Sequence, residues 1–583
     1  NALRTIHPEL SIRNFRVTPL MIGGLVYVVT PLRLAAALDA GTGETQWLYD
    51  PDVIRSTRNS INAPGYSLRG LAYWEDENTR RIFYGTPDGY LLAVDAKTGE
   101  PILAFGNNGR VDLSTDIPRG GRDTTDHRGF PWISVNSPPI VARGIVVTPV
   151  SISDQPITKE QPPGWVKGID ALTGETKWIF RTIPQSDDFG NDTWHSESWR
   201  YTGGTNVWST FSVDEDLGYI YLPTGTPTND YYGGHRPGDN LFAESLVALN
   251  IETGQRVWHF QVVHHGVWDY DFPTHPNLVD ITVAGREIRA IAQVSKQGFT
   301  YVFDRVSGEP VWPIEERSVE TDTNLNGEVL SPTQPFPTKP LPFEDQGSSI
   351  DQLVDFTPDI RSIAVEAVKN HRLGGLFSPP MLAVSDGIQG TIQRPAIGGG
   401  ANWMGSAVDP QTGLLYIPSL NAYSVMRYVT PEAEGANLNY TQGGFNTPSL
   451  MPQGLPLFKP PYSRITAIDL NTGEHSWMQP NGDGDRYRNL PLLRDLNLPP
   501  LGGDGRGGPV LTSTLLISAL SAGGSNGGPR LVARDKMTGE IVGSVDLPGG
   551  AIGTPMTYMH QDKQYIALTV GGDVPELIAL ALP

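Results

Sequence analysis

Two aspartates two residues apart are the first candidates for chemistry in this chain. Asp269 and Asp271 lie in the run HHGVWDYDFP at residues 264–273. If this run is extended, side chains two positions apart share a face, so both carboxylates enter the same space. Paired carboxylates repel each other unless a cation or a shared proton lies between them. The pair fits a hard-metal ligand beside a general base, and an acidic turn facing water is the ordinary alternative.

The composition excludes several kinds of partner and site. The 583 residues include 65 Gly and 50 Pro, which suits short strands and tight turns rather than long helices. The net charge of −20 argues against nucleic acid as a partner. Because the chain has no cysteine, it can form no disulfide, thiolate zinc site, thiol nucleophile or covalently attached haem. No apolar run reaches about 18 residues, so we expect no membrane span.

A turn motif recurs along the chain and predicts the architecture. Its pattern is Ala-x-Asp-x-x-Thr-Gly-x-x-x-Trp, first seen from Ala37 to Trp47. The Asp side chain can open a tight turn by bonding the backbone, and Gly takes the positive-φ position. A Trp at a fixed place can dock on the next unit and bury a large area. Seven copies occur, five of them with the Trp, and they begin at Ala37, Ala93, Gly168, Ala248, Val302, Ala467 and Ala533.

The spacing of the copies predicts an all-β, eight-bladed β-propeller. Most copies lie about 55–80 residues apart, which is the length of a four-stranded blade with its loops. The gap from Val302 to Ala467 is twice as long, so we place a blade without the motif near residues 398–418. We expect one domain over residues 1–583, with long loop insertions over one face at about 313–390 and 437–461.

The turn motif with its docking Trp resembles that of the quinoprotein alcohol and sugar dehydrogenases, which use pyrroloquinoline quinone (PQQ). The similarity runs from about residue 15 to the C-terminus. It is most specific over residues 219–280, which contain YLPTG, GGHRPGDN and the HHGVWDYDFP run. Together with the stretch PTQPFPTKP, these motifs are more similar to the glucose and quinate dehydrogenase branch than to the methanol dehydrogenases. We expect a member of that branch without its membrane domain.

The resemblance implies roles for individual residues around a PQQ cofactor. Asp269 matches the aspartate that takes the hydroxyl proton of the substrate, and Lys296 matches the cation that contacts the quinone oxygens. Arg69 matches an arginine that holds a cofactor carboxylate, and Trp208 matches a tryptophan that stacks under the planar ring. The other implied cofactor contacts are Asn136, Thr205 and Trp403.

The resemblance also implies a metal ion, with calcium as the first expectation and a lanthanide or magnesium as alternatives. The expected oxygen ligands are Asp269, Asp271, Thr226 and an acid of the third blade, either Asp154 or, as second choice, Glu160. Thr226 stands where the family has an asparagine and is a weaker ligand.

A further departure concerns the roof over the cofactor. The alcohol dehydrogenases place two adjacent cysteines there, at the positions of Ala63 and Pro64 in this chain. Tyr66 is a candidate to cover the cofactor in their place.

These residues predict a PQQ-dependent dehydrogenase that oxidises an alcohol to the carbonyl. Nearby cations would keep Asp269 ionised, so that it can accept the hydroxyl proton while hydride moves to the quinone. The metal and Lys296 would stabilise the charge that develops on the quinone oxygens. The substrate would be a bulky primary alcohol, a cyclic secondary alcohol, a polyol or a sugar. Electrons would pass to an external acceptor, a cytochrome c or a quinone, and the family implies a periplasmic location.

Two other functions remain open at this point. A non-catalytic propeller scaffold for protein assembly could carry the same repeat, but it would need neither Lys296 nor the Trp-Asp-Tyr-Asp run. A hydrolase that uses Asp and His would leave Arg69 and Trp208 without a role. We expect His264 and His265 to be structural.

Overall fold

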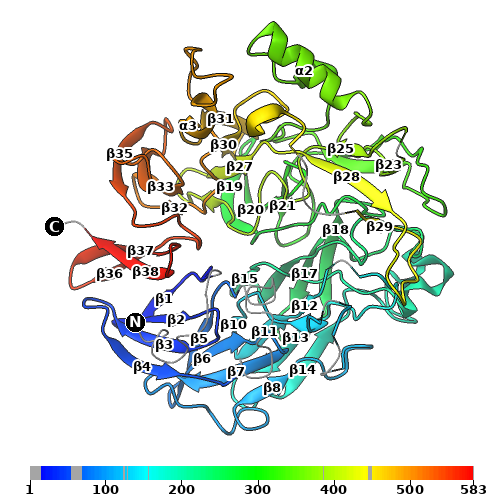
Figure 1. The fold of residues 1–583 in the computed structure, drawn as a ribbon. Helices are drawn as coiled ribbons and strands as arrows, with labels where there is room; N and C mark the ends of the chain where they lie inside the picture. The colour runs from blue at the N-terminus through cyan, green and yellow to red at the C-terminus, as the bar shows by residue number, and fades with distance from the viewer. Residues whose placement is uncertain are drawn as a thin grey trace.

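The chain forms a ring of β-sheets around a central axis (Figure 1). The computed structural model describes residues 15–53, 68–121, 125–127, 129–154, 156–384, 386–443 and 449–581. Within these ranges the ring consists of eight antiparallel sheets, six with four strands and two with three. The predicted eight-bladed β-propeller is therefore confirmed.

The blades follow one another in chain order. The first blade consists of β1 (Leu20–Ile22), β2 (Leu25–Val29), β3 (Ala35–Asp39) and β4 (Thr45–Tyr49), and the second of β5 (Ala72–Glu75), β6 (Arg80–Gly85), β7 (Tyr90–Asp95) and β8 (Arg110–Asp112). The third consists of β10 (Ile140–Ala142), β11 (Ile145–Pro149), β13 (Val166–Asp170) and β14 (Thr176–Phe180). The fourth consists of β15 (Ser212–Asp214), β16 (Tyr219–Pro223), β17 (Ser245–Asn250) and β18 (Arg256–Gln261). The fifth blade consists of β19 (Asn277–Val283), β20 (Arg286–Val294) and β21 (Thr300–Asp304), and the sixth of β26 (Ala407–Val408), β27 (Leu414–Leu420), β30 (Ser463–Asp469) and β31 (Glu474–Pro480). The seventh consists of β32 (Val510–Leu511), β33 (Leu515–Leu520), β34 (Arg530–Asp535) and β35 (Ile541–Asp546). The eighth consists of β36 (Met556–His560), β37 (Lys563–Val570) and β38 (Glu576–Ala581).

Each turn motif follows the third strand of its blade, and in six of the seven copies it leads into a fourth strand. In the first copy, Oδ1 of Asp39 accepts hydrogen bonds from the backbone N–H groups of Gly41, at 3.0 Å, and Thr42, at 2.8 Å. Gly43 has φ +74°, which a residue with a Cβ rarely adopts. The motif therefore fixes both the turn and the register of the third and fourth strands.

The motif tryptophans dock on the next blade. Trp47 Nε1 donates to the Ala96 carbonyl at 3.0 Å, and a Cβ on Gly99, the turn glycine of the next blade, would lie 2.5 Å from the Trp47 ring. Trp178 donates in the same way to Ile251 at 2.8 Å and packs on the turn glycine Gly254. The turn glycine thus serves two purposes: it permits the positive φ and leaves room for the neighbouring indole.

The predicted place of the blade without the motif is wrong. Strand β27 pairs with β30, so residues 414–420 belong to the same sheet as the Ala467 copy of the motif. The blade without the motif is the C-terminal one, β36–β38. The long gap after Val302 contains one insertion between Asp304 and Ala407 and a second inside the next blade, between Leu420 and Ser463, rather than an additional blade, which the spacing alone could not distinguish.

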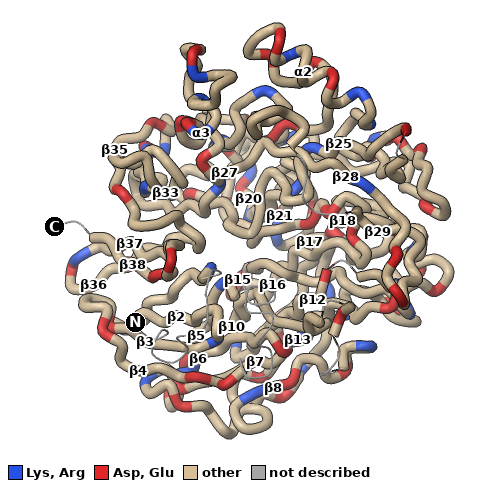
Figure 2. The backbone as a smooth tube through the Cα atoms, viewed as in Figure 1, with Lys and Arg blue, Asp and Glu red and all other residues tan. Residues whose placement is uncertain are grey.

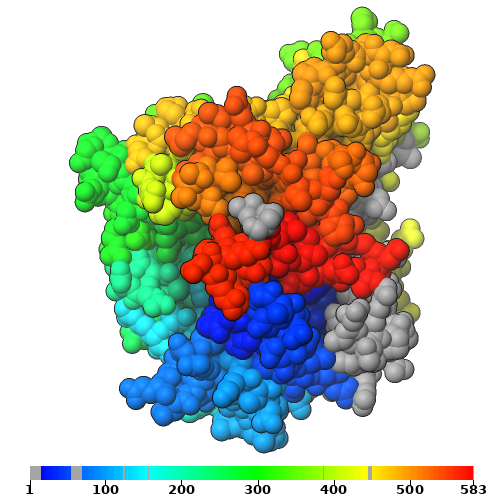
Figure 3. All heavy atoms as spheres, turned by 90° about the vertical axis from the view of Figure 1, so that its left-hand side faces the viewer, coloured from blue at the N-terminus to red at the C-terminus, as the bar shows by residue number. Residues whose placement is uncertain are grey.

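The ring closes between its first and last blades. Tyr558 Oη donates to the Ala40 carbonyl at 2.9 Å across a sequence separation of 518 residues. Phe15 and Val17 pack with Ile552 and Leu577 in one apolar cluster. Figure 3 shows the C-terminal blade lying directly against the N-terminal one.

Two long segments leave the ring on either side of β26 and β27. The first contains β22 (Ile314–Ser318), β23 (Thr333–Pro337), the helix α2 (Pro358–Val368), β24 (Met381–Leu382) and β25 (Thr391–Gln393). The second contains β28 (Ser424–Val429) and β29 (Thr441–Gln442), and β28 pairs with β24 and β25 of the first. Side chains such as Ile360, Phe458 and Leu493 build a separate apolar core, which belongs to the projecting part of the molecule (Figure 3).

Among the described residues, no helix combines the length and apolar character needed to cross a bilayer. Acidic positions recur around the rim of the ring, in keeping with the net charge (Figure 2).

Candidate active site

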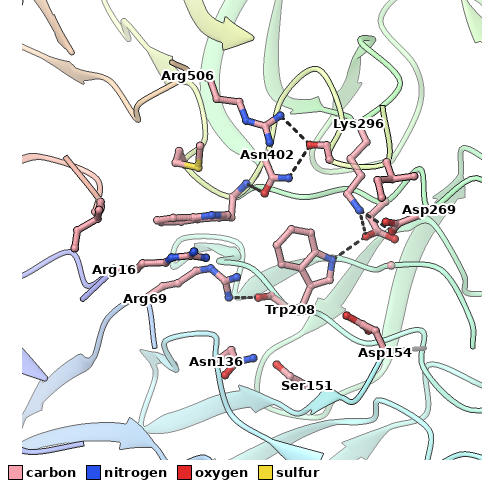
Figure 4. Close-up of a pocket in the computed structure, with 18 of the residues that line it drawn as sticks. Arg16, Arg69, Asn136, Ser151, Asp154, Trp208, Asp269, Lys296, Asn402 and Arg506 are labelled. Carbon is pink, nitrogen blue, oxygen red and sulfur yellow. Dashed lines mark hydrogen bonds and ion pairs between the residues drawn. The ribbon is translucent and has the colours of Figure 1, made fainter. Parts of the chain in front are cut away.

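A cavity of about 790 Å³ lies at the centre of the ring. Its lining begins at Arg16, ahead of the first blade, and ends at Gly553, ahead of the last strands. Nine of the residues predicted for the site line it: Arg69, Asn136, Asp154, Trp208, Thr226, Asp269, Asp271, Lys296 and Trp403. Figure 4 shows that Lys296 and Asp269 lie on one side of Trp208, while Arg16 and Arg69 lie on the other.

Asp269 and Asp271 converge on the ammonium group of Lys296. Lys296 Nζ lies 2.6 Å from Oδ1 of Asp269 and 2.7 Å from Oδ2 of Asp271. The two carboxylates face the same space as predicted, but the backbone is not extended there, because Asp269 has φ +55°. Burial lowers the pKa of Lys296, but the two carboxylates outweigh this effect and raise it above the ordinary value.

Asp271 is held as an anion by four donors. Besides Lys296, it accepts hydrogen bonds from Thr226 N at 2.7 Å, Thr226 Oγ1 at 2.9 Å and Trp208 Nε1 at 3.0 Å. Burial alone would raise the pKa of this carboxyl, yet Lys296 and the other donors bring it below its ordinary value. Asp271 therefore serves as the fixed negative charge of the pair.

Asp269 has the opposite character. Burial raises the pKa of its carboxyl well above the ordinary value, Lys296 opposes the rise, and Asp271 adds to it. Lys296 favours the ionised form of Asp269 and burial opposes it, so the expectation that nearby cations, the metal among them, keep this carboxyl ionised stays a prediction. Its other oxygen accepts a hydrogen bond from Tyr231 Oη at 3.2 Å. A carboxyl with a raised pKa beside an open cavity is well suited to take up a proton.

The Trp208 ring lies between two cations. The Arg69 guanidinium carbon is 5.2 Å from the ring centroid and Lys296 Nζ is 5.4 Å from it. Arg69 also donates to the Trp208 carbonyl at 2.5 Å. Burial, reinforced by Arg16, lowers the pKa of Arg69 to about 9. An aromatic surface with a cation at each side is a suitable platform for a flat anion.

Three other predicted cofactor contacts occupy different positions. Trp403 faces the cavity, with the Arg69 guanidinium 5.3 Å from its ring centroid. Asn136 also lines the cavity, and its Oδ1 is buried without a hydrogen-bond partner among the described residues. Thr205 lies behind the wall, where its backbone N–H donates to the Thr226 carbonyl at 3.1 Å. It supports Thr226 rather than forming part of the cavity surface.

The two candidate acids of the third blade are separated by the structure. Asp154 lines the cavity. The Glu160 side chain is exposed and accepts a hydrogen bond from the Asn437 amide at 2.6 Å, so it is not brought to the cavity. The geometry therefore favours Asp154 as the ligand. The residues expected near the roof, Ala63, Pro64 and Tyr66, lie outside the described ranges.

Two acids of the site, Asp230 and Glu244, were not predicted from the sequence. Burial raises the pKa of Asp230 well above its ordinary value, and the carboxylates of Asp154, Asp269 and Asp271 add to the rise. Burial also raises the pKa of Glu244 to about 8. Glu244 Oε1 is 2.9 Å from Thr226 Oγ1, which also bonds Asp271. Glu244 carried a recognisable signal, because a charged residue directly precedes an apolar strand that the turn motif marks as buried.

The segment between β21 and β26 holds the loop that carries Asp269. Glu328 Oε1 lies 2.7 Å from Nε2 of His265, and both side chains are almost fully buried. Gln334 exchanges two hydrogen bonds of 2.8 Å with the backbone of His264, and Trp268 Nε1 donates to the Ser378 carbonyl at 2.8 Å. The two histidines thus hold structure, as expected, and the inserted segment positions the loop of Asp269.

Comparison with known proteins places this geometry in a family. The family model for the β-propeller domain of PQQ-dependent glucose/ethanol/alcohol dehydrogenases matches residues 4–566. The quinoprotein glucose dehydrogenase of Escherichia coli (strain K12) is 31% identical over 600 residues, covering 95% of this chain and 70% of that protein. The glycerol dehydrogenase large subunit of Gluconobacter oxydans (strain 621H) is 29% identical, with 97% of this chain and 78% of that protein covered.

Solved structures agree on the fold. The quinohemoprotein alcohol dehydrogenase from Comamonas testosteroni superposes with a TM-score of 0.66 at 22% identity, over 96% of this chain and 71% of that one. A europium-containing methanol dehydrogenase superposes with a TM-score of 0.62 at 21% identity, over 97% of this chain and 85% of that one. On the sequence match over most of its length, this chain belongs to the family of PQQ-dependent dehydrogenase β-propellers.

Proposed function

We propose that the central cavity binds PQQ and a divalent cation and oxidises an alcohol or sugar, with Asp269 as the general base. As a quinoprotein dehydrogenase, the chain is an oxidoreductase that acts on CH–OH groups. The observation that carries the proposal is the arrangement around Trp208: Asp269, Asp271 and Lys296 lie at one side of its ring and Arg69 at the other.

The residues present fit PQQ, a flat molecule with several carboxylates. Trp208 and Trp403 offer aromatic surfaces, and Arg69 is a planar donor for a carboxylate. Arg69 Nε and Asn136 Oδ1 are buried and have no hydrogen-bond partner among the described residues, so a donor and an acceptor remain for a ligand. When bound, PQQ supplies the quinone that accepts the hydride.

The protein residues would divide the remaining work. Asp269 would take the proton from the substrate hydroxyl, because its raised pKa makes it the proton acceptor of the pair. Asp271, fixed as an anion, would keep Lys296 charged and in place. Lys296 would in turn stabilise negative charge that develops beside it during oxidation.

The acidic side of the cavity supports a metal ion. Asp154, Asp230, Asp269 and Asp271 influence one another's charge there, and Lys296 provides the positive charge. Carboxylate oxygens are the ligands that calcium prefers, and magnesium or a lanthanide shares that preference. As the side chains stand, no three His, Cys, Asp or Glu residues in the described ranges form a complete metal site. The cation would therefore complete its coordination with the hydroxyl of Thr226 or with groups of the bound cofactor.

Relatives act on glucose, glycerol, and quinate or shikimate, so a polyol or a cyclic secondary alcohol is the substrate class that we propose. Because the chain lacks cysteine and hence a covalent haem, we propose that electrons leave to an external cytochrome c or quinone.

A dye-reduction assay on the purified chain tests the proposal. The substrates would be glucose, glycerol, quinate and simple alcohols, with and without PQQ, and with calcium, magnesium or lanthanum. We expect reduction only when both PQQ and a metal are present. Dye reduction that does not depend on PQQ, or no PQQ binding with any metal, would refute the proposal and favour a non-catalytic scaffold.

A further inference from the structure

Three guanidinium groups line the cavity without a carboxylate partner. Arg16, Arg69 and Arg506 all contribute to the wall, and none forms an ion pair within the part of the chain that the structure describes. Buried arginines elsewhere meet a carboxylate or backbone carbonyls: Arg464 lies 2.8 Å from Glu344, and Arg236 donates to the carbonyls of Asn229 and Gly266. An unpaired buried cation is costly. The cavity therefore has a positive region that suits an anionic ligand.

Arg506 differs from the other two because backbone carbonyls accept the hydrogen bonds of its guanidinium group. Its Nη1 donates to the carbonyls of Gly398, Gly399 and Gly400 at 2.8, 2.5 and 3.3 Å. This binding braces the glycine loop that leads to Trp403. Arg506 is thus chiefly a positioning residue, and Arg16 and Arg69 are the cations left for a ligand.

Arg16 and Arg69 share one aromatic partner. Their guanidinium carbons lie 6.0 and 5.3 Å from the centroid of Trp403. The indole holds two like charges close together, which is unfavourable until an anion joins them. Arg69 is 9% exposed, and its Nε has no hydrogen-bond partner among the described residues. Arg69 therefore keeps one N–H donor that no described protein group uses.

We propose that Arg16 and Arg69 form a two-arginine clamp for a carboxylate of the bound cofactor. The inference rests on the proposed function and adds Arg16, from the segment ahead of the first blade, to the cofactor site. The carboxylate is assigned to the cofactor rather than to the substrate because of position. Arg16 and Arg69 lie across Trp208 from Lys296 and Asp269, where the substrate hydroxyl must react (Figure 4).

Equilibrium dialysis of metal-loaded, PQQ-free protein against PQQ tests the clamp without any turnover. We expect Arg16→Gln to weaken PQQ binding by about 10- to 100-fold, the range for a lost hydrogen bond between charged groups. Arg16→Lys should recover part of the loss, because it keeps the charge but not the planar fork. The matched control is Arg200→Gln, which removes a guanidinium stacked 4.4 Å from Trp199 outside the cavity.

A second ligand identifies the group that is recognised. The trimethyl ester of PQQ has no free carboxylate, so wild type and Arg16→Gln should bind it equally. If Arg16→Gln binds PQQ itself as tightly as wild type does, the clamp is refuted. If wild type binds no PQQ at all, the proposed function fails first. If the variant keeps PQQ affinity but its KM rises for quinate and not for glycerol, the clamp holds the substrate and the inference is wrong.

Thermal unfolding separates the clamp from a structural role. Without ligand, Arg16→Gln removes a repulsion, so its Tm should equal or exceed that of wild type. Saturating PQQ should then raise its Tm by less than it raises the wild-type Tm. A lower ligand-free Tm together with unchanged PQQ affinity would make Arg16 a purely structural residue and would refute the proposal.

Discussion

Lys296 Nζ lies 2.6 Å from Oδ1 of Asp269, and the same ammonium lies 2.7 Å from Asp271. One cation therefore serves two carboxylates of different character. Asp271 is stabilised as an anion by several donors, whereas the pKa of Asp269 is raised by burial. In the mechanism that we propose, Asp271 therefore keeps its negative charge while Asp269 takes up the proton of the substrate.

Replacing the proposed base should separate chemistry from binding. We expect Asp269→Asn to lower kcat by about 10²- to 10⁴-fold, the usual contribution of a general base. PQQ affinity should change little, because the amide keeps the volume of the carboxylate. Single-turnover reduction followed optically, with PQQ binding measured in parallel, checks both expectations. A variant that keeps most of its turnover would show that another group accepts the proton.

Removing the shared cation should affect stability as well as activity. Lys296→Met leaves two buried carboxylates without their ammonium, which costs about 3–5 kcal/mol when a buried pair is broken. Lys296→Arg keeps a charge there and should lose much less. Urea unfolding of the ligand-free proteins measures both differences. Equal stability of the two variants would mean that charge does not matter at this position.

Glu244 should make stability depend on pH. Burial raises the pKa of its carboxyl to about 8 in the folded protein. The unfolded chain releases this proton near the ordinary pKa of about 4.3, so stability is lost as pH rises from there to about 8. The slope from this group is about 1.4 kcal/mol per pH unit. Glu244→Gln should remove this pH dependence. Urea unfolding at pH 5, 6.5 and 8 should show that the free energy of unfolding of the variant rises relative to that of wild type at each step.

Adjacent histidines provide a matched test of the inserted segment. Glu328 pairs with His265 in the interior, whereas Glu316 pairs with His264 at 3.1 Å near the surface. Glu328→Gln should cost about 3–5 kcal/mol and lower turnover, because the loop of Asp269 loses its support. Glu316→Gln should cost less than about 1 kcal/mol. Similar losses in both variants would mean that the buried pair does not hold the loop.

Two turn glycines separate strain from packing. Gly254 has φ +69° and a Cβ there would lie 2.5 Å from the Trp178 ring, whereas Gly285 has φ +79° and no atom within 4 Å of such a Cβ. Gly285→Ala should therefore report the backbone cost alone, about 1 kcal/mol. Gly254→Ala should cost about 1–3 kcal/mol more, because the docked indole must move. Thermal unfolding compares the two variants. Equal shifts in Tm would show that the Trp178 indole moves without a loss of stability.

The sequence predicted the propeller because its repeat specifies local contacts. The aspartate, the turn glycine and the tryptophan lie within eleven residues of one another, and their partners are the next copy of the same motif. The blade without the motif was misplaced because β27 and β30 pair across residues 421–462, a separation that no local pattern reveals.

The site was predictable where a motif carried it and hidden elsewhere. Asp269, Asp271, Lys296 and Trp208 stand in recognisable runs, and the structure brings them together. Arg16 stands in no such run, and only ring closure carries it to the cavity. The charge of Asp269 could not be read from its neighbours, because it depends on how deeply the loop is buried.

Ring closure determines when the protein can acquire its ligand. The cavity is lined from Arg16 to Gly553, and Tyr558 of the last blade fastens to Ala40 of the first. During synthesis the binding chamber therefore does not exist until the blade β36–β38 has emerged. Loading must follow the synthesis of this last blade, and a chain cut short before it would have an open groove, so such a truncation should eliminate cofactor capture outright instead of weakening it.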